Sequence, residues 1–211
     1  MDMDTTIKGI SANQEAVERI LNEILAEDLN DNVTIKIKGI KSIHDVSEYD
    51  DFRVSIEANF FTIKVNMKID ITTGGLIIPK EVDYEYKLMF EDRNIEIKAY
   101  NLNTILAEKI ESIMARNVSN TRARDFYDVY ILFTLRNHEI YMDSLRSALK
   151  KKAEERNTLI YLEQSEKYLK DIDESDDLRE IWTSYKEKYP YAKDIEFSEI
   201  INVLKNIIEI K

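Results

Sequence analysis

The chain has 211 residues and a net charge of −11, from 30 Lys and Arg against 41 Asp and Glu, which argues against a uniformly basic surface for nucleic acid. It contains no cysteine, which excludes disulfides and thiolate chemistry, and its two histidines are too few for a histidine-rich zinc site. No apolar run approaches the roughly 20 residues of a membrane span, so we expect a cytoplasmic protein that has no membrane association.

The beginning of the chain has the pattern of a β-α-β unit. Residues 3–10 read as a strand, and Ser11 and Gln14 have the spacing of a capping box. Apolar residues then recur at helical period, which predicts an amphipathic helix over residues 12–28. Residues 33–38 alternate between apolar and polar side chains, as in a half-covered strand.

Two further strands are predicted to form a long hairpin. Residues 52–59 and 63–72 both alternate between apolar and polar side chains, and the turn falls near residues 60–61. One face is apolar and is expected to pack on helices. The other face therefore presents Lys68 and Asp70 together on the open side of the sheet.

The rest of the chain changes from strand to helical period. Extended pieces around residues 84–90 and 94–99 are predicted to complete the sheet. A helix of about four turns then begins near Asn101, and Thr121 is expected to cap the next one. The sequence thus predicts an α+β fold, with a mixed-sheet core over 1–100 and an all-helical domain over 101–211. The later helices are expected near 122–136, 141–155, 159–170, 176–188 and 196–209.

Three aspartates are the strongest candidates for metal ligands. On a strand, Asp2 and Asp4 point to one face while Met3 turns into the core. Two carboxylates about 4 Å apart repel by roughly 4 kcal/mol at an effective dielectric near 20, so such a pair holds a proton or recruits a cation. Asp70 would complete a triad for Mg²⁺, and Lys68 on the same face would meet phosphate oxygens. The alternatives are a solvated acidic N-terminus and an ordinary sheet-surface aspartate.

Charged residues around the first two predicted helices form a second candidate group. Lys109 falls within an apolar stripe and should have an anionic partner, either a structural carboxylate or a substrate phosphate. Asp125 lies in the first turn of the next helix, where it favours the helix dipole or serves a site. Three arginines bracket the turn between the two helices and form the best basic patch of the chain: Arg116, Arg122 and Arg124.

These motifs, in this order, resemble those of the AbiEii/AbiGii abortive-infection toxin family of nucleotidyltransferases. The resemblance covers roughly residues 2–135 and implies a DNA polymerase β-like core that takes a nucleoside triphosphate (NTP) with Mg²⁺. The strings that carry it are Asp2-Met3-Asp4, Lys68-Ile69-Asp70-Ile71-Thr72-Thr73-Gly74, Asn101-Leu102-Asn103-Thr104-Ile105-Leu106-Ala107-Glu108-Lys109-Ile110-Glu111 and Arg124-Asp125-Phe126-Tyr127-Asp128-Val129-Tyr130.

The resemblance also implies roles and partners. The expected reaction is metal-dependent transfer of a nucleotidyl group from an NTP to an acceptor hydroxyl, by a toxin of a toxin–antitoxin system for phage defence. The acceptor is left open: an RNA such as tRNA could bind through the patch from Arg116 to Arg124, and a protein or a small molecule fits the net charge of −11 equally well. A cognate antitoxin is a further expected partner. The implied catalytic residues are Asp2, Asp4, Asp70, Lys109 and Asp125, of which the first three bind metal, and the implied nucleotide contacts are Lys68, Lys109 and Arg124.

One motif of the family is missing from the sequence. The family places a Gly-Ser or Gly-Gly turn a short distance before its Asp-x-Asp, and in this sequence only Met1 precedes Asp2. We therefore expect an N-terminally truncated core without the phosphate-binding turn. The first alternative function is that of a catalytically degenerate or truncated relative that acts as a protein-binding module. A metal-dependent hydrolase is the second alternative, because carboxylate triads serve such enzymes too.

Overall fold

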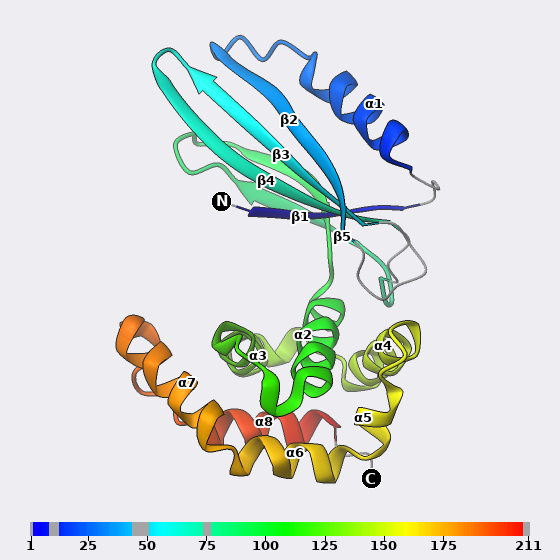
Figure 1. Ribbon diagram of the computed structural model, residues 1–211, viewed down its shortest axis with the longest axis vertical. Coiled ribbons are helices and arrows are strands. Elements are labelled where there is room, and N and C mark those ends of the chain that lie inside the picture. Colours follow the sequence, from blue (N-terminus) through cyan, green and yellow to red (C-terminus); the bar gives the residue numbers. More distant parts are fainter. Residues whose placement is uncertain (1, 9–12, 44–50, 74–76, 209–211) are drawn as a thin grey trace. The chain divides into compact units, whose positions relative to one another are not determined.

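The chain folds as two units (Figure 1). A computed structural model describes residues 2–8, 13–43, 51–73 and 77–208. The sheet unit comprises Met1–Gly75, and the helical unit comprises Leu76–Lys211. Together they give the α+β class that the sequence predicts, with a mixed sheet in the first unit and most of the helices in the second.

The sheet unit contains a four-stranded mixed sheet in the order β1-β4-β3-β2. Strand β3 is antiparallel to both β2 and β4, and β1 is parallel to β4. The predicted hairpin is confirmed, and its turn contains Phe61 at φ 49°, a backbone region that β-branched and bulky residues rarely adopt. The strands are β1 Asp2–Ile7, β2 Val33–Ile43, β3 Asp51–Phe60 and β4 Ile63–Thr73.

Helix α1 (Gln14–Leu25) begins two residues later than the sequence predicted. Its N-cap is Asn13, whose side chain accepts a hydrogen bond from the backbone N–H of Ala16 at 2.8 Å. Asparagine and serine are equally good N-caps, so the capping-box spacing of Ser11 could not decide between them. The predicted cap was therefore wrong, and Ser11 itself lies outside the described residues.

The core of the sheet unit lies between α1 and one face of the sheet. Val17 of α1 is completely buried among apolar side chains of β3 and β4. Met3, which the sequence placed in the core, is instead 59% exposed. The reason is that α1 packs along β2, at the opposite edge of the sheet from β1 (Figure 1). The buried residues are Val17, Phe52, Val54, Ile56 and Ile71.

A separate hairpin opens the helical unit. Strands β5 (Val82–Lys87) and β6 (Asn94–Ala99) pair only with each other among the described residues, as a two-stranded antiparallel sheet. The prediction that these segments complete the main sheet was wrong. Alternation identifies a strand but not its partner, and both sides of β4 are already taken by β1 and β3.

The helices of the second unit follow the predicted order with two local differences. Helix α3 begins at Ala123, and its N-cap position, Arg122, makes no side-chain capping bond, so the capping role predicted for Thr121 was wrong. The helix predicted over 159–170 is divided at Gln164, whose ψ of 33° departs from helical geometry. The helices are α2 Leu102–Arg116, α3 Ala123–Leu135, α4 Met142–Glu155, α5 Leu159–Glu163, α6 Ser165–Glu174, α7 Asp176–Lys188 and α8 Phe197–Ile208.

The helical unit has one large apolar core. Helix α2 packs against both α3 and α4, and α8 packs against α3 and α6. Phe126 is 2% exposed, with its ring centroid 5.5 Å from that of Phe197. Trp182 is also buried, and its indole N–H donates to the carbonyl of Ile195 at 3.1 Å. In the described part of the chain, no helix is long and apolar enough to span a membrane.

Candidate active site

Asp4 and Asp70 are direct neighbours on adjacent strands. The parallel pairing of β1 with β4 aligns Asp4 with Asp70 and Asp2 with Lys68. Aligned residues share a face of the sheet, and adjacent strands lie about 4.8 Å apart, so one cation could reach both carboxylates. This face is opposite to the one that Ile69 and Ile71 present to the core. The side chain of Asp2 lies outside the described part of the structure.

Arg53 holds the carboxylate of Asp70 in a two-pronged ion pair. Its Nε donates to Oδ1 of Asp70 at 2.8 Å, and its Nη2 donates to Oδ2 at 2.7 Å. These hydrogen bonds hold the pKa of Asp70 below its usual range, and the charge of Lys68 acts in the same direction. Asp70 is therefore an anion at neutral pH. The sequence reasoning had not selected Arg53 as a site residue.

The donor set suits a hard divalent cation that keeps part of its hydration shell. Asp4 and Asp70 offer carboxylate oxygens, the ligands that Mg²⁺ prefers, and Mg²⁺ commonly binds through one or two carboxylates plus substrate phosphates. Among the side chains that the structure describes, no cluster of three Asp, Glu, His or Cys could hold a metal by itself. The pair thus fits a cation that completes its coordination with water and a phosphorylated substrate.

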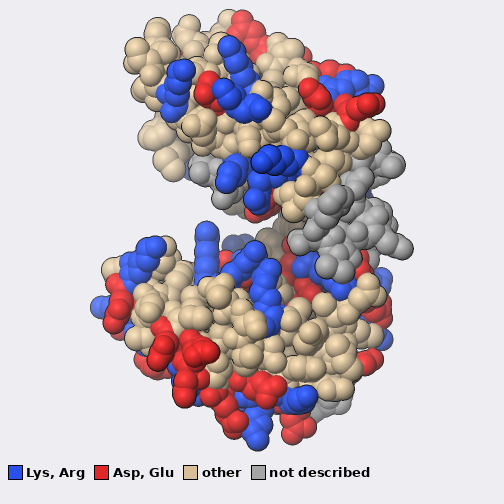
Figure 2. Space-filling view, in the orientation of Figure 1, with Lys and Arg blue, Asp and Glu red and all other residues tan. Residues whose placement is uncertain are grey.

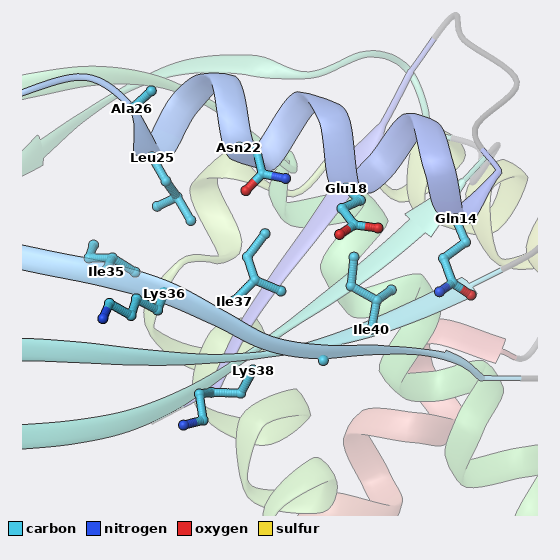
Figure 3. A pocket seen from close by; sticks show the side chains of 11 residues that line it. Gln14, Glu18, Asn22, Leu25, Ala26, Ile35, Lys36, Ile37, Lys38 and Ile40 are labelled. Atoms are coloured by element: carbon cyan, nitrogen blue, oxygen red, sulfur yellow. The ribbon is translucent and has the colours of Figure 1, made fainter.

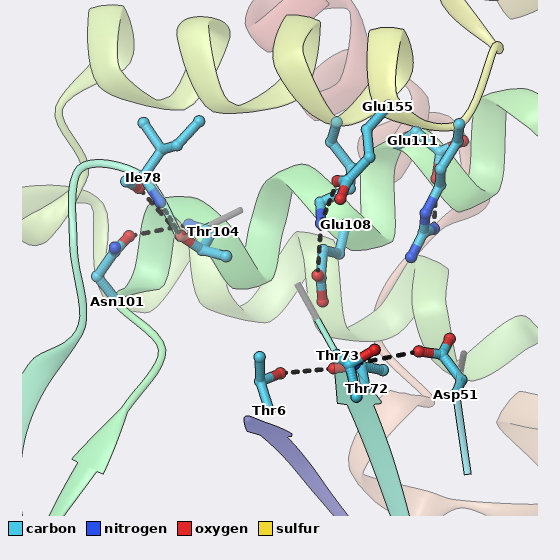
Figure 4. Close-up of polar contacts among 12 residues, drawn as sticks. Thr6, Asp51, Thr72, Thr73, Ile78, Asn101, Thr104, Glu108, Glu111 and Glu155 are labelled. Carbon is cyan, nitrogen blue, oxygen red and sulfur yellow. Dashed lines mark hydrogen bonds and ion pairs between the residues drawn. The ribbon is translucent and has the colours of Figure 1, made fainter. Parts of the chain in front are cut away.

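Side-chain hydrogen bonds also link β4 to β1 and β3 on the C-terminal side of Asp70. The hydroxyls of Thr6 and Thr72 lie 2.6 Å apart across the β1–β4 pairing (Figure 4). Asp51 of β3 accepts a hydrogen bond from the backbone N–H of Thr73 at 3.3 Å. Side-chain hydrogen bonds thus link β4 to both of its neighbours near its C-terminal end, which fixes the register that aligns Asp4 with Asp70.

In the helical unit, Lys109 joins α2 to α3. Its ammonium lies 3.3 Å from Oδ1 of Asp125 and 2.6 Å from Oδ2 of Asp128, and its side chain is 26% exposed. The anionic partner predicted for Lys109 is therefore present. Asp128, which the sequence reasoning left out of the site, is the closer of the two. Arg124 is largely exposed and lies 3.8 Å from Asp128.

The two glutamates beside Lys109 face a different helix. Glu108 lies 3.2 Å from the ammonium of Lys152, a buried lysine of α4. Glu111 accepts hydrogen bonds from Arg156 at 2.7 Å and from Thr158 at 2.8 Å. Successive helical residues point about 100° apart, so this charged segment divides its side chains between α3 and α4. Glu108 and Glu111 therefore belong to helix packing.

One of the three arginines of the predicted basic patch lies near an acidic side chain, since Arg124 is 3.8 Å from Asp128. The guanidinium of Arg116 donates to the hydroxyl of Ser112, and Arg122 is exposed. On the face drawn in Figure 2, Lys and Arg are interspersed with Asp and Glu on both units. The predicted contact of this patch with a nucleotide or an RNA therefore stays a prediction.

A groove of about 620 Å³ lies between α1 and β2. Gln14, Glu18 and Asn22 extend from the helix over Ile37 and Ile40 of the strand (Figure 3). The groove lies on the α1 side of the sheet, whereas Asp4 and Asp70 point to the other side. Its polar side chains are exposed, so it lacks the buried, convergent polar groups of a specific binding site.

Comparisons with known proteins identify the family of this chain. A family model described as "Nucleotidyl transferase AbiEii toxin, Type IV TA system" matches residues 1–203. The crystal structure of JHP933 from Helicobacter pylori is similar at 16% identity and a TM-score of 0.41, over 98% of this chain and 73% of that chain. A candidate nucleotidyltransferase structure from H. pylori is similar at 15% identity and a TM-score of 0.40, over 98% of this chain and 75% of that one. No curated protein matches the chain significantly.

Proposed function

We propose that this chain, which belongs to the AbiEii nucleotidyl transferase toxin family of type IV toxin–antitoxin systems, transfers a nucleotidyl group from an NTP to an acceptor hydroxyl. The observation that carries the proposal is the alignment of Asp4 with Asp70 on adjacent strands. Two carboxylates on one open sheet face are suited to hold Mg²⁺ together with the phosphates of a nucleotide.

Each candidate residue then has a defined task in the reaction. Asp4 and Asp70, with Asp2 as the third expected carboxylate, would hold Mg²⁺. The cation would orient the phosphates and neutralise the charge that develops during transfer. Lys68, whose charge already acts on Asp70, would contact a phosphate oxygen on the same face.

Residues of the helical unit would act on the nucleotide through a preformed ion-pair group. Asp125 and Asp128 hold the ammonium of Lys109 in place, which limits the rotamers that this long side chain can adopt. Lys109 would contact a phosphate, and the exposed guanidinium of Arg124 would make a further nucleotide contact. Asp125 would thus serve by positioning Lys109.

The biological setting follows from the family by inference. The proposed role is that of a cytoplasmic toxin of an abortive-infection system, with phage defence as its outcome and a cognate antitoxin as its partner. The acceptor would be an RNA such as tRNA, or a protein. The net charge of −11 favours neither one, because an RNA would need local basic residues such as Arg124.

Label transfer tests the proposal directly. The purified chain is incubated with each NTP labelled at the α-phosphate, with Mg²⁺ and with either total RNA or total protein as acceptor. Asp4→Asn and Asp70→Asn should each reduce labelling by about 100-fold or more, since even outer-shell changes at metal sites cost about 10–100-fold. Asp83→Asn is the matched control, because Asp83 lies on β5 and pairs with Lys98.

The outcome distinguishes this function from its alternatives. Labelling by the unchanged chain that disappears in both site variants and persists in Asp83→Asn supports nucleotidyl transfer at this carboxylate pair. Labelling that survives in both Asp4→Asn and Asp70→Asn would place the reaction elsewhere. No labelling of either acceptor with any NTP would contradict the proposed activity of this chain.

A further inference from the structure

Arg53 belongs to a row of four charged residues that crosses the open face of the sheet. Register aligns Lys41 of β2 with Arg53 of β3, Arg53 with Asp70 of β4, and Asp70 with Asp4 of β1. Two cations thus stand beside two anions. Of these neighbours, Arg53 is the one that hydrogen-bonds to both oxygens of Asp70, at 2.8 and 2.7 Å.

The bidentate guanidinium of Arg53 occupies lone-pair positions of Asp70 that a cation would otherwise use. An ionised carboxylate has about four lone-pair positions, and a bidentate guanidinium takes one on each oxygen. A divalent cation at Asp70 would share the remaining positions and would face the positive charge of Arg53 across one carboxylate. Arg53 and the cation therefore bind Asp70 in opposition to each other.

The pair is open enough for such an exchange. The side chain of Arg53 is 46% exposed and that of Asp70 is 25% exposed, so water screens their attraction. A guanidinium fork also matches the geometry of phosphate oxygens. A triphosphate that arrives with its cation would offer Arg53 a new anionic partner as Arg53 gives up Asp70.

We propose that Arg53 is a positioning residue that competes with a divalent cation for Asp70 and makes cation binding depend on the triphosphate. This inference rests on the proposed function, since it concerns the same carboxylate pair. Without a nucleotide, Arg53 neutralises Asp70 and keeps its affinity for the cation low. With a nucleotide, the phosphates draw the guanidinium away and the cation binds more tightly.

Titration of the full chain with Mn²⁺ alone, followed by electron paramagnetic resonance of the free ion, tests the competition. Arg53→Gln should bind Mn²⁺ about fivefold more tightly than the unchanged chain, which is the upper end of what an exposed ion pair contributes. Lys41→Gln is the matched control, because it removes the same charge from the same row, and it should change the affinity by less than about twofold. Asp70→Asn should lose the Mn²⁺ site.

A second measurement examines the dependence on triphosphate. A nonhydrolysable NTP should tighten Mn²⁺ binding more in the unchanged chain than in Arg53→Gln, after correction for Mn²⁺ bound to the free nucleotide. Arg53→Lys keeps the charge but cannot form the fork, so its Mn²⁺ affinity should lie between the two. Circular dichroism of each variant establishes that the fold is retained.

The outcomes separate this inference from the function on which it rests. Unchanged or weaker Mn²⁺ binding in Arg53→Gln, with loss in Asp70→Asn, would overturn the competition and leave the carboxylate site in place. Absence of Mn²⁺ binding in both the unchanged chain and Arg53→Gln would overturn the metal site as well. Binding that appears only in Arg53→Gln would support the competition in its strongest form.

Discussion

The ion pair between α2 and the segment after α4 has one buried and one partly exposed partner, so replacing either partner should destabilise the fold by a different amount. Glu111 is 3% exposed, whereas the side chain of Arg156 is 44% exposed. Glu111→Gln removes charge-assisted hydrogen bonds worth about 1.5–3 kcal/mol but leaves a guanidinium that water can solvate. Arg156→Gln leaves a buried carboxylate whose remaining described side-chain partner is the hydroxyl of Thr158.

The expected order of destabilisation follows from that asymmetry. Loss of one partner of a buried ion pair costs about 3–5 kcal/mol, and the retained bond from Thr158 places Arg156→Gln near the lower limit, at about 3 kcal/mol. Glu111→Gln should cost less, about 2 kcal/mol. Thr158→Val, which removes a hydrogen bond and keeps the ion pair, should cost about 1 kcal/mol.

Urea unfolding followed by tryptophan fluorescence measures these costs in the helical unit alone. The chain contains one tryptophan, and Trp182 is buried in the core of that unit at 2% exposure. Midpoint shifts at constant slope give the change in the free energy of unfolding. An Arg156→Gln variant that is as stable as Glu111→Gln, or more stable, would refute the assignment of the buried charge to Glu111.

Three further predictions concern the core, a helix cap and the carboxylate pair. Phe126→Ala should lower the free energy of unfolding by about 3–5 kcal/mol in the same fluorescence assay, because its ring is buried; a loss below about 1 kcal/mol would contradict this. Asn101→Ala should destabilise the helical unit by about 1 kcal/mol or more, seen as a lower Tm by circular dichroism. The side chain of Asn101 caps α2 by accepting from the backbone N–H of Thr104, and it also donates to the carbonyl of Lys80. An unchanged Tm would exclude a stabilising role for this cap. Carbon-detected NMR titration should find the pKa of Asp70 below its ordinary value and should find it higher in Arg53→Gln, because the hydrogen bonds from Arg53 are the largest cause of the lowering. Because the pKa of Asp70 is lower in the folded chain than in the unfolded chain, its ionisation stabilises the fold at pH values above the unfolded pKa of about 4. This stabilisation is lost as the pH falls through the folded pKa, so the unchanged chain should lose more stability in acid than Arg53→Gln. Identical loss of stability in acid for the two chains would refute this.

The β3–β4 hairpin shows how much the alternation of apolar and polar residues, together with the position of one turn, can predict. Alternation placed Asp70 on the open face, and the turn near residues 60–61 also determines the register of β3 against β4. The turn of the structure is one residue later, at Phe61-Thr62, and counting from it brings Arg53 opposite Asp70, whereas counting from residues 60–61 would bring Arg53 opposite Lys68. The sequence therefore predicted the hairpin and the open face but not the ion pair, because a shift of one residue in the turn changes the partner of Arg53.

Other features depend on tertiary contacts that no local pattern contains. The parallel pairing of β1 with β4 joins segments that no turn connects, so the sequence could propose the neighbourhood of Asp4 and Asp70 but not their alignment. The apolar stripe around Lys109 predicted an anionic partner. The packing of α3 against α2 selected Asp128 as the closer partner, together with Asp125.

The parallel β1–β4 pairing also constrains the order in which the strands of the sheet can pair during folding. Thr6 and Thr72, which contact each other across these strands, are 66 positions apart, whereas β3 and β4 meet through a short turn. Closing a long loop costs more entropy than closing a short one, so the local hairpin has the advantage in forming first. On the ribosome, β1 has no place to dock until synthesis has passed β4. Asp4 and Asp70 therefore meet late, and a nascent chain that ends before β4 cannot assemble the carboxylate pair.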